Sequence, residues 1–392
     1  MAKKISIIGS GTAGAIGAAH FSRWTDCEID WYYDSKIKTM PVGEGSLTNL
    51  PQMLFDAVDF GYDNLGEIDG TPKLGIHKSG WGNDTDFKEH FKPGTTAYHF
   101  NAVKLQQFLF KKLDGRVNLI DKNVGSHDEL DSDFIFDCKG FPKEFSEHHK
   151  SEYISVNAVY VTQCLWDIPK FNYTLTIAVP HGWVFGIPLN NRCAIGYMYN
   201  DQINTLDEIK EDVKNVFDRF GLNPSETTLE LHFNNYYRKQ NFVGRSAYSG
   251  NTSFFLEPLE ATSIGFMDQI QRMATGHWFQ GNTSDEVNDF YEQSIKEIEN
   301  IIMLHYFAGS KHKTPFWDYA QERGQKCIEN AVKTPRFAEF YKDSKNYNFK
   351  SFLNIPIQKM MYGSWDQRIM KMNLNSLGLI DKIDELLNKG TS

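Results

Sequence analysis

The sequence predicts an α/β protein in which an N-terminal parallel sheet is followed by a second, mainly antiparallel sheet and a helical C-terminal portion. Residues 4–9 (KISIIG) are a short β-branched run that ends at glycine, which indicates a buried strand. A helix over 12–24 and a strand over 28–33 complete a βαβ opening, which is typical of a parallel sheet. Residues 153–199 are rich in β-branched and aromatic residues, whereas a helical apolar period runs from about 285 onward.

Shorter signals refine this outline. A further apolar strand is expected over 133–137, and the middle region contains strand-like runs at 175–179 and 193–197. The segment DEVNDFYEQSIKEIENII and the closing SLGLIDKIDELLNK both show helical periodicity. The chain contains no tandem repeat and no long linker, which favours one compact unit.

Charge and cysteine usage exclude several classes of protein. The net charge of −9 argues against a nucleic-acid partner, because phosphate binding requires clustered Lys and Arg. No apolar run approaches the roughly 20 residues that span a bilayer, so no membrane partner is expected. The five cysteines form no CxxC pair, which is typical of a reducing compartment and predicts a cytoplasmic protein. The histidines show no metal-ligand spacing, so no metal site is expected.

A glycine-rich turn between the first strand and the first helix predicts a dinucleotide site. Its sequence is GxGxxG, formed by Gly9, Gly11, Thr12, Ala13 and Gly14. The first glycine permits a tight turn, the second lets the backbone approach a pyrophosphate, and the third lets helix and strand pack closely. Asp34 follows the second strand, where a carboxylate can accept hydrogen bonds from the adenosine ribose. The fingerprint alone does not distinguish FAD from NAD, and the chain holds one such fingerprint, so a second nucleotide site is not expected.

Four further motifs connect the chain to a known family. They are VGEG at 42–45 with Asn49-Leu50 beyond it, GTPKLGI at 70–76, GWVFGIP at 182–188, and FLEPLEAT at 255–262. In these motifs the sequence resembles the tryptophan-halogenase-like family of flavin-dependent halogenases, from Ile5 to about Trp317. The segments His305-Tyr306 and 314–317 (TPFW) resemble the family's helical substrate-side segment, and the C-terminal region is shorter than in tryptophan-specific members.

The resemblance implies a fold and a domain organisation. The fold would be an FAD-binding, Rossmann-like domain of the flavin monooxygenase type, with an added mixed or antiparallel β-sheet and a helical C-terminal substrate region. Residues 1–290 would form the FAD-binding body, with a substrate-facing sheet inserted at about 150–245. Residues 291–392 would form the helical substrate side.

The resemblance also assigns roles to individual residues. Lys73 and Glu260 correspond to the family's catalytic lysine and glutamate. A lysine buried among apolar neighbours has a lowered pKa, so it could hydrogen-bond hypohalous acid or become a haloamine. Glu260 would orient the hypohalous acid or accept the ring proton. Gly43, Glu44 and Asn251 would join the fingerprint residues in holding the cofactor.

Two positions depart from the family pattern. Trp183, Phe185, Ile187 and Pro188 would form the wall and tunnel between flavin and substrate, and Phe185 replaces the usual tryptophan. Backbone N–H groups at Thr262 and Ser263 would bind the halide, and Ser263 replaces the usual glycine. Because an L-residue resists positive φ, we expect a differently shaped halide site that favours bromide or iodide over chloride.

The function implied is FADH2- and O2-dependent halogenation of an electron-rich aromatic small molecule, of indole or phenol type, through hypohalous acid. The cofactors would be FAD as FADH2, O2 and a halide (bromide, iodide or chloride), and a separate flavin reductase would be the partner. A homo-oligomer and a carrier-bound substrate stay open. The alternatives are a flavin-dependent monooxygenase, another FAD oxidoreductase without halide chemistry, or a flavin-binding protein without activity.

Overall fold

The N-terminal sheet carries the predicted βαβ opening. The computed structural model describes residues 3–37, 43–83, 85–348 and 360–389. Its first sheet has the order β17-β18-β9-β1-β2-β8, and β1 pairs in parallel with both β2 and β9. The strands and their crossover helix are β1 (Lys4–Ile8), α1 (Thr12–Trp24), β2 (Glu28–Tyr33), β8 (Asn118–Asp121), β9 (Phe134–Asp137), β17 (Phe242–Val243) and β18 (Ser246–Tyr248). The predicted strands at 4–9, 28–33 and 133–137 and the helix at 12–24 are therefore confirmed.

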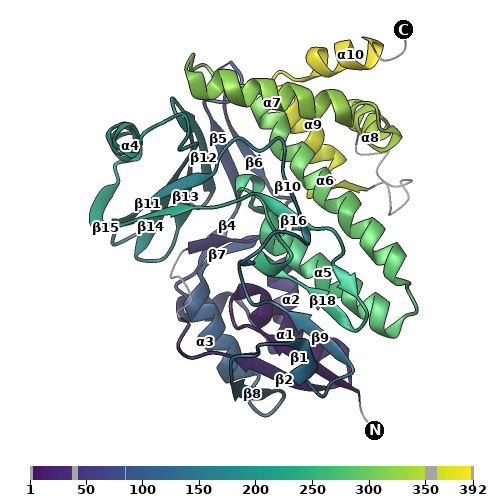
Figure 1. Cartoon of the computed structure of the whole chain (residues 1–392). Helices are drawn as coiled ribbons and strands as arrows, with labels where there is room; N and C mark the ends of the chain where they lie inside the picture. The colour runs from purple at the N-terminus through teal and green to yellow at the C-terminus, as the bar shows by residue number, and fades with distance from the viewer. Residues whose placement is uncertain (1–2, 38–42, 84, 349–359, 390–392) are drawn as a thin grey trace.

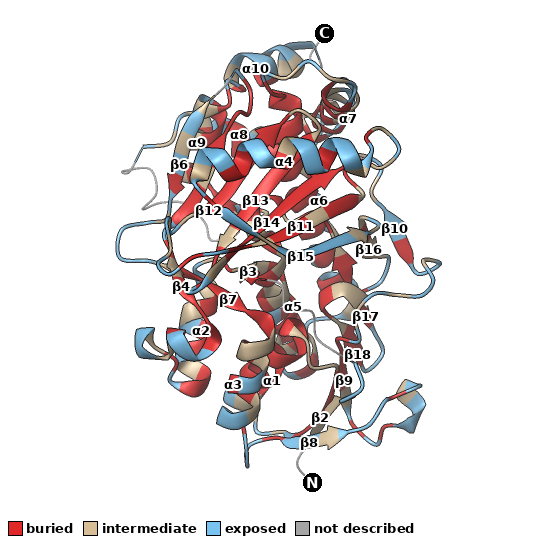
Figure 2. Ribbon diagram, turned by 90° about the vertical axis from the view of Figure 1, so that its left-hand side faces the viewer, coloured by how far each residue is buried: buried red, intermediate tan, exposed pale blue. Residues whose placement is uncertain are grey.

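A second sheet of seven strands has the order β15-β11-β14-β13-β12-β5-β6. Its strands are β5 (Gly75–Ser79), β6 (Asp86–His90), β11 (Ala158–Leu165), β12 (Thr174–Val179), β13 (Gly182–Pro188), β14 (Arg192–Tyr199) and β15 (Asn223–His232). All neighbours pair antiparallel except β12 and β5, so the sheet is mixed. Helix α4 (Leu206–Phe220) crosses one face of it (Figure 2). Because β5 and β6 precede residue 150, the sheet is not confined to the insertion predicted at 150–245.

Smaller sheets and helices connect these two layers. Strands β3 (Gly43–Gly45), β7 (Ala97–Asn101) and β4 (Thr71–Lys73) form a three-stranded sheet, and β4 and β7 lie between the two large sheets (Figure 1). Another three-stranded sheet joins β10 (His148–Lys150), β16 (Tyr236–Arg238) and β19 (Phe254–Phe255). Helices α2 (Asn49–Val58) and α3 (Ala102–Lys112) pack against α1. The residues of β3 and β4 are thus held where the two layers meet.

The C-terminal portion is helical, as predicted. It contains α5 (Thr262–Phe279), α6 (Ser284–Ala308), α7 (Pro315–Ala331), α8 (Pro335–Lys345), the hairpin β20 (Met361–Tyr362) and β21 (Trp365–Asp366), α9 (Gln367–Ser376) and α10 (Ile380–Lys389). Helix α6 begins after its N-cap Thr283, whose side chain accepts a hydrogen bond from Glu286 N. The helix therefore runs continuously through the boundary expected at 290/291. Within the described ranges, no helix is long and apolar enough to cross a membrane.

Candidate active site

The glycine fingerprint adopts the geometry that a pyrophosphate requires. Gly9 has φ +99°, and a methyl group there would lie 2.3 Å from the carbonyl oxygen of Cys138. A methyl group on Gly14 would lie 2.0 Å from the Gly9 carbonyl oxygen, so both positions require glycine. The space beside Gly11 is open, and α1 begins there without a side-chain cap. Free N–H groups therefore face open space at the helix N-terminus, which fits a phosphate group.

The other predicted cofactor residues gather around this turn. The Thr12 hydroxyl donates to the Glu44 carboxylate at 2.9 Å, and burial raises the pKa of Glu44 to about 7. A methyl group on Gly250 would lie 2.7 Å from the Ala13 side chain, which places Asn251 beside the start of α1. Asp34 follows β2 and accepts hydrogen bonds from Asn123 and from Lys36 N. Val42 of the VGEG motif lies outside the described residues.

A cavity of about 340 Å³, named the apolar cavity here, opens next to these groups. The predicted cofactor residues Gly43, Glu44 and Asn251 line it. Its apolar surface comes mainly from the second sheet and the chain after β18: Val159, Val161, Phe185, Ile187, Met198 and Phe254. An apolar space that reaches Glu44, the partner of Thr12 in the glycine-rich turn, fits the isoalloxazine ring of a flavin.

Strand β13 divides the predicted wall residues between this cavity and the core. Phe185 and Ile187 line the apolar cavity. The Phe185 ring packs on Gly196, where an added methyl group would lie 2.0 Å from the ring. Trp183 is buried, and its indole N–H donates to Glu257 Oε2 at 2.9 Å. Pro188 contributes its carbonyl oxygen, which accepts from Thr71 at 2.7 Å. Trp183 is thus a core residue of this face, and Phe185 presents an aromatic ring to the cavity.

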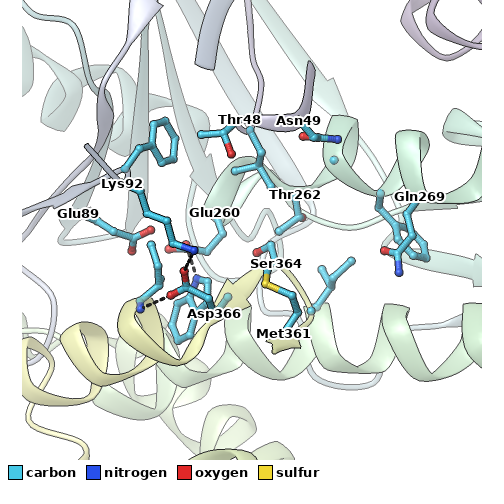
Figure 3. A pocket seen from close by; sticks show the side chains of 18 of the residues that line it. Thr48, Asn49, Glu89, Lys92, Glu260, Thr262, Gln269, Met361, Ser364 and Asp366 are labelled. Atoms are coloured by element: carbon cyan, nitrogen blue, oxygen red, sulfur yellow. Dashed lines mark hydrogen bonds and ion pairs between the residues drawn. The ribbon is translucent and has the colours of Figure 1, made fainter. Parts of the chain in front are cut away.

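A second cavity of about 400 Å³, named the polar cavity here, lies beside the C-terminal hairpin. Figure 3 shows Glu89, Lys92, Glu260 and Asp366 together at one end of it, with an ion pair of 3.1 Å between Lys92 and Asp366. Its lining combines residues that are far apart in the sequence: Leu47, Phe91, Thr262, Phe266, Ile298, Trp365 and Arg368. Polar and aromatic groups therefore surround a space large enough for a small aromatic molecule.

The turn before α5 separates the two cavities. Pro258, Ala261 and Ser263 line the apolar cavity, whereas Glu260 and Thr262 line the polar cavity. Glu260 and Ala261 have positive φ, at 74° and 52°. For non-glycine residues this left-handed conformation is strained, and such strain clusters at functional sites. The turn therefore presents Glu260 to one cavity while its neighbours face the other.

Ser263 is not in the positive-φ conformation that an L-residue resists. Ser263 lies in the first turn of α5 with right-handed helical geometry, and the left-handed positions are Glu260 and Ala261. The backbone N–H groups of Thr262 and Ser263 lie at the N-terminus of an 18-residue helix. This position suits an anion, because the first N–H groups of a helix lack internal partners.

Lys73 lies at the same boundary. It is fully buried at the end of β4, and its Nζ donates to Ser46 O at 2.9 Å. Gly45 lines the apolar cavity, and a β-carbon on Gly45 would lie 3.5 Å from Lys73 Nζ. Phe91 lines the polar cavity, and the centre of its ring lies 5.7 Å from Lys73 Nζ. Burial lowers the pKa of Lys73 to about 8, and the carboxylates of Glu260 and Glu89 oppose this only in part.

Glu260 is also buried, and its carboxylate oxygens contact three side chains. Oε2 accepts from the Trp365 indole N–H at 2.7 Å, and Oε1 contacts Lys78 Nζ and His305 Nε2, the latter at 3.1 Å. Burial acts to raise the pKa of Glu260, but the Lys78 ammonium and the His305 contact outweigh it and hold the pKa well below its usual range. The sequence reasoning missed Lys78 and Trp365. The available signal was a lysine at an inward position of the strand that follows Lys73.

No other chemistry is apparent in the described parts of the chain. They contain no group of His, Cys, Asp and Glu that could hold a metal ion. All five cysteines are free, and four of them are buried. Within the described residues, the site consists of the two cavities and their boundary.

Comparison with known proteins decides the family. The model of the tryptophan halogenase family matches residues 4–118 and 110–367. The chain belongs to the tryptophan halogenase family. The family prediction is therefore confirmed, and the enzyme is a flavin-dependent halogenase that uses FADH2, O2 and a halide on aromatic substrates.

Individual relatives are distant. The chain is similar to the tryptophan 7-halogenase RebH of Lentzea aerocolonigenes, with 22% identity over 80% of this chain and 78% of RebH. It is 28% identical to the tryptophan 6-halogenase ThaL of Streptomyces albogriseolus over 53% of this chain, which corresponds to 41% of ThaL.

Solved structures show the same fold. MibH, a tryptophan 5-halogenase, matches with a TM-score of 0.79 at 17% identity, over 96% of this chain and 86% of MibH. Xcc4156, a flavin-dependent halogenase from Xanthomonas campestris, matches with a TM-score of 0.74 at 17% identity, over 99% of this chain and 96% of Xcc4156. The predicted fold class is confirmed.

Proposed function

We propose that this halogenase modifies a small aromatic molecule of indole or phenol type in the polar cavity, while the flavin ring occupies the apolar cavity. The observation that carries the proposal is the boundary between the cavities, where Lys73 and the turn from Glu260 to Ser263 lie. Reagents formed on one side would have to pass these residues to reach a ring on the other side. The names of RebH and MibH as tryptophan halogenases support an indole-type substrate.

The cofactor-side residues would bind and orient. Gly9, Gly11 and Gly14 would hold the pyrophosphate at the start of α1, and Asp34 the adenosine ribose. Asn251 would face the ribityl chain of the flavin, and Thr12 and Glu44 would lie beside it. When bound, reduced FAD would activate O2, which is the oxidant that converts the halide to hypohalous acid. The N–H groups of Thr262 and Ser263 would hold the halide.

Lys73 and Glu260 would act on the substrate side. Because the pKa of Lys73 is lowered to about 8, a fraction of its amine is unprotonated near neutral pH. That amine would hydrogen-bond the hypohalous acid or carry its halogen as a haloamine. Glu260 would orient the electrophile or take the proton that leaves the ring. Phe185 and Ile187 would keep the substrate away from the flavin, which disfavours direct monooxygenation.

The cellular setting completes the proposal. Since the chain holds one dinucleotide fingerprint, a separate flavin reductase would provide FADH2. Five free cysteines agree with work in the reducing cytoplasm.

The test is an assay of the purified enzyme with FAD, NADH and a flavin reductase, oxygen, indole and each halide in turn. We expect a halogenated indole by mass spectrometry, in an amount that depends on halide. Hydroxylated indole without any halogenated product would contradict the proposal and support the monooxygenase alternative.

A further inference from the structure

A second buried lysine, Lys78, contacts two residues that line the polar cavity, Glu89 and Glu260. It occupies β5, and none of its side chain is exposed. Its Nζ contacts Glu260 Oε1, Glu89 Oε2 at 2.8 Å and Asn373 Oδ1 at 2.7 Å. An ammonium group has three N–H donors, so each donor has one partner. A buried charge this well satisfied has a fixed position.

The two residues behind Lys78 are themselves fixed. Asn373 on α9 donates from Nδ2 to Glu89 Oε2 at 2.8 Å and to Ile369 O at 3.0 Å. This pair of hydrogen bonds sets the orientation of the amide, so its oxygen must point to Lys78. Glu89 on β6 is 3% exposed and supplies a counter-charge. The lysine therefore has a rigid support on the side away from Glu260.

The remaining contacts of Glu260 come from other elements. Trp365 donates to Oε2, and the Trp365 ring lies 5.2 Å from Lys78 Nζ. His305 on α6 donates from Nδ1 to Ile301 O at 2.9 Å, which directs its Nε2 to Glu260. The other charged groups near the cavity are Lys73 on β4, Arg368 on α9 and the ion pair of Lys92 with Asp366. Of the described cations, Lys78 is the one in contact with Glu260.

We propose that Lys78 is a positioning residue for halogenation, which keeps the Glu260 carboxylate ionised and fixed toward the polar cavity while Glu89 and Asn373 hold Lys78 in place. The inference rests on the proposed role of Glu260. Electrophilic attack places positive charge on the aromatic ring, and a nearby ionised carboxylate stabilises that charge. Burial alone acts to protonate Glu260, whereas Lys78 reverses this effect.

The two buried lysines therefore have different tasks. Lys78 has two carboxylate partners, and its pKa is raised even though burial opposes this. Lys73 forms no ion pair with any described residue, and its pKa is lowered. Lys73 can lose its proton and react, whereas Lys78 stays an ammonium ion and holds the carboxylate.

The test compares three variants of the full-length enzyme. Lys78→Met alone leaves Glu89 and Glu260 as uncompensated buried carboxylates, so it is expected to fold poorly. The double variant Lys78→Met/Glu89→Gln removes one charge of each sign, so the net charge of the cluster is unchanged. Lys88→Met, an exposed lysine on the same strand as Glu89, is the matched control. Each is assayed for halogenation between pH 5 and pH 8, for reduced-flavin oxidation and for thermal unfolding.

We expect the folded double variant to oxidise reduced flavin normally and to halogenate about 10- to 100-fold more slowly, within the range of a lost general acid–base or orienting contact. Its kcat should fall further as the pH drops from 8 to 5, because Glu260 then becomes protonated in that range. The wild type and Lys88→Met should not show this acid limb.

A double variant with the wild-type kcat and an unchanged pH profile would overturn the inference. Glu260→Gln separates this failure from failure of the proposed function. If Glu260→Gln is inactive while the double variant is normal, the role of Lys78 is wrong and that of Glu260 stands. If Glu260→Gln halogenates normally, the proposed site itself is wrong.

Discussion

The apolar cavity and the polar cavity differ in how they are built. The described lining of the apolar cavity contains one carboxylate, Glu44, and no lysine or arginine. The polar cavity has five charged residues in its lining: Glu89, Lys92, Glu260, Asp366 and Arg368. An apolar space suits a flat cofactor ring, whereas opposed charges suit chemistry in which a ring gains and loses positive charge. The difference supports our proposal that the electrophile is made in one cavity and used in the other.

The largest effect is expected from the carboxylate of the polar cavity. Glu260→Gln keeps the shape of the side chain but removes its charge, so halogenation should fall about 10²- to 10⁴-fold, with FAD affinity unchanged. Glu257→Gln is the matched control in the same motif, because Glu257 binds Trp183 and Tyr306 and lines neither cavity. Single-turnover product formation measures both variants. Equal losses in the two would contradict the assignment of Glu260.

A second prediction concerns how the buried charge of Lys73 affects the stability of the folded protein. The pKa of Lys73 is about 8 in the folded protein and about 10.5 when unfolded, so below pH 8 its charge is buried at a cost of about 3 kcal/mol. The unfolded state binds the extra proton between pH 8 and pH 10.5, so wild-type stability should rise with pH there. Lys73→Met should be more stable than wild type at pH 7, by about 2 kcal/mol after loss of the hydrogen bond to Ser46.

Urea unfolding at pH 7 and pH 9.5 measures this difference, which should shrink at the higher pH. Lys78→Met is the matched buried lysine and should be destabilised by about 3–5 kcal/mol, because it leaves carboxylates unpaired. A Lys73→Met variant less stable than wild type at both pH values would show that Lys73 is not a strained buried cation.

A smaller effect is expected on the apolar side. In Gly196→Ala the added methyl group would meet the ring of Phe185, which must move toward the apolar cavity. Overpacking of this kind costs about 1–3 kcal/mol, so FAD binding should weaken roughly 10-fold. Gly66→Ala, where the space is open, is the control. Fluorescence titration with FAD measures both; equal affinities in two folded variants would place the flavin ring elsewhere.

The smallest effect is expected at the boundary turn. Because Ser263 has helical geometry, Ser263→Gly should lower stability by no more than about 1 kcal/mol and leave the ratio of brominated to chlorinated product unchanged. Competition assays with equal bromide and chloride measure the ratio. A clear shift toward chloride would show that the serine shapes the halide site after all.

The two cavities also differ in how far the sequence predicted them. Gly9 and Gly14 were predicted because a local motif fixes their geometry, and Glu44 and Asn251 were predicted from the family resemblance. Glu260 was predicted from the family resemblance, but its charged surroundings were not, since Glu89 meets Asn373 across 284 positions and Glu260 meets Trp365 across 105. Such contacts depend on tertiary packing, which no local pattern encodes.

Backbone conformation explains the remaining error. The family resemblance led us to expect an altered halide site, because a serine in place of glycine resists positive φ, but Ser263 lies in the first helical turn of α5. The left-handed residues precede the helix, at Glu260 and Ala261. An N-terminal turn that reverses direction before a helix strains the residues outside it, and residue type alone did not reveal which ones these are.

We propose that Lys73 holds the electrophile made at the flavin, by a hydrogen bond or as a haloamine, before it meets the substrate. The most direct measurement follows the enzyme and Lys73→Ala with FADH2, O2, bromide and indole, and records flavin oxidation and product mass in the same sample. The account predicts equal flavin oxidation in both proteins and brominated indole from the wild type alone. Brominated indole from Lys73→Ala at the wild-type rate would contradict it.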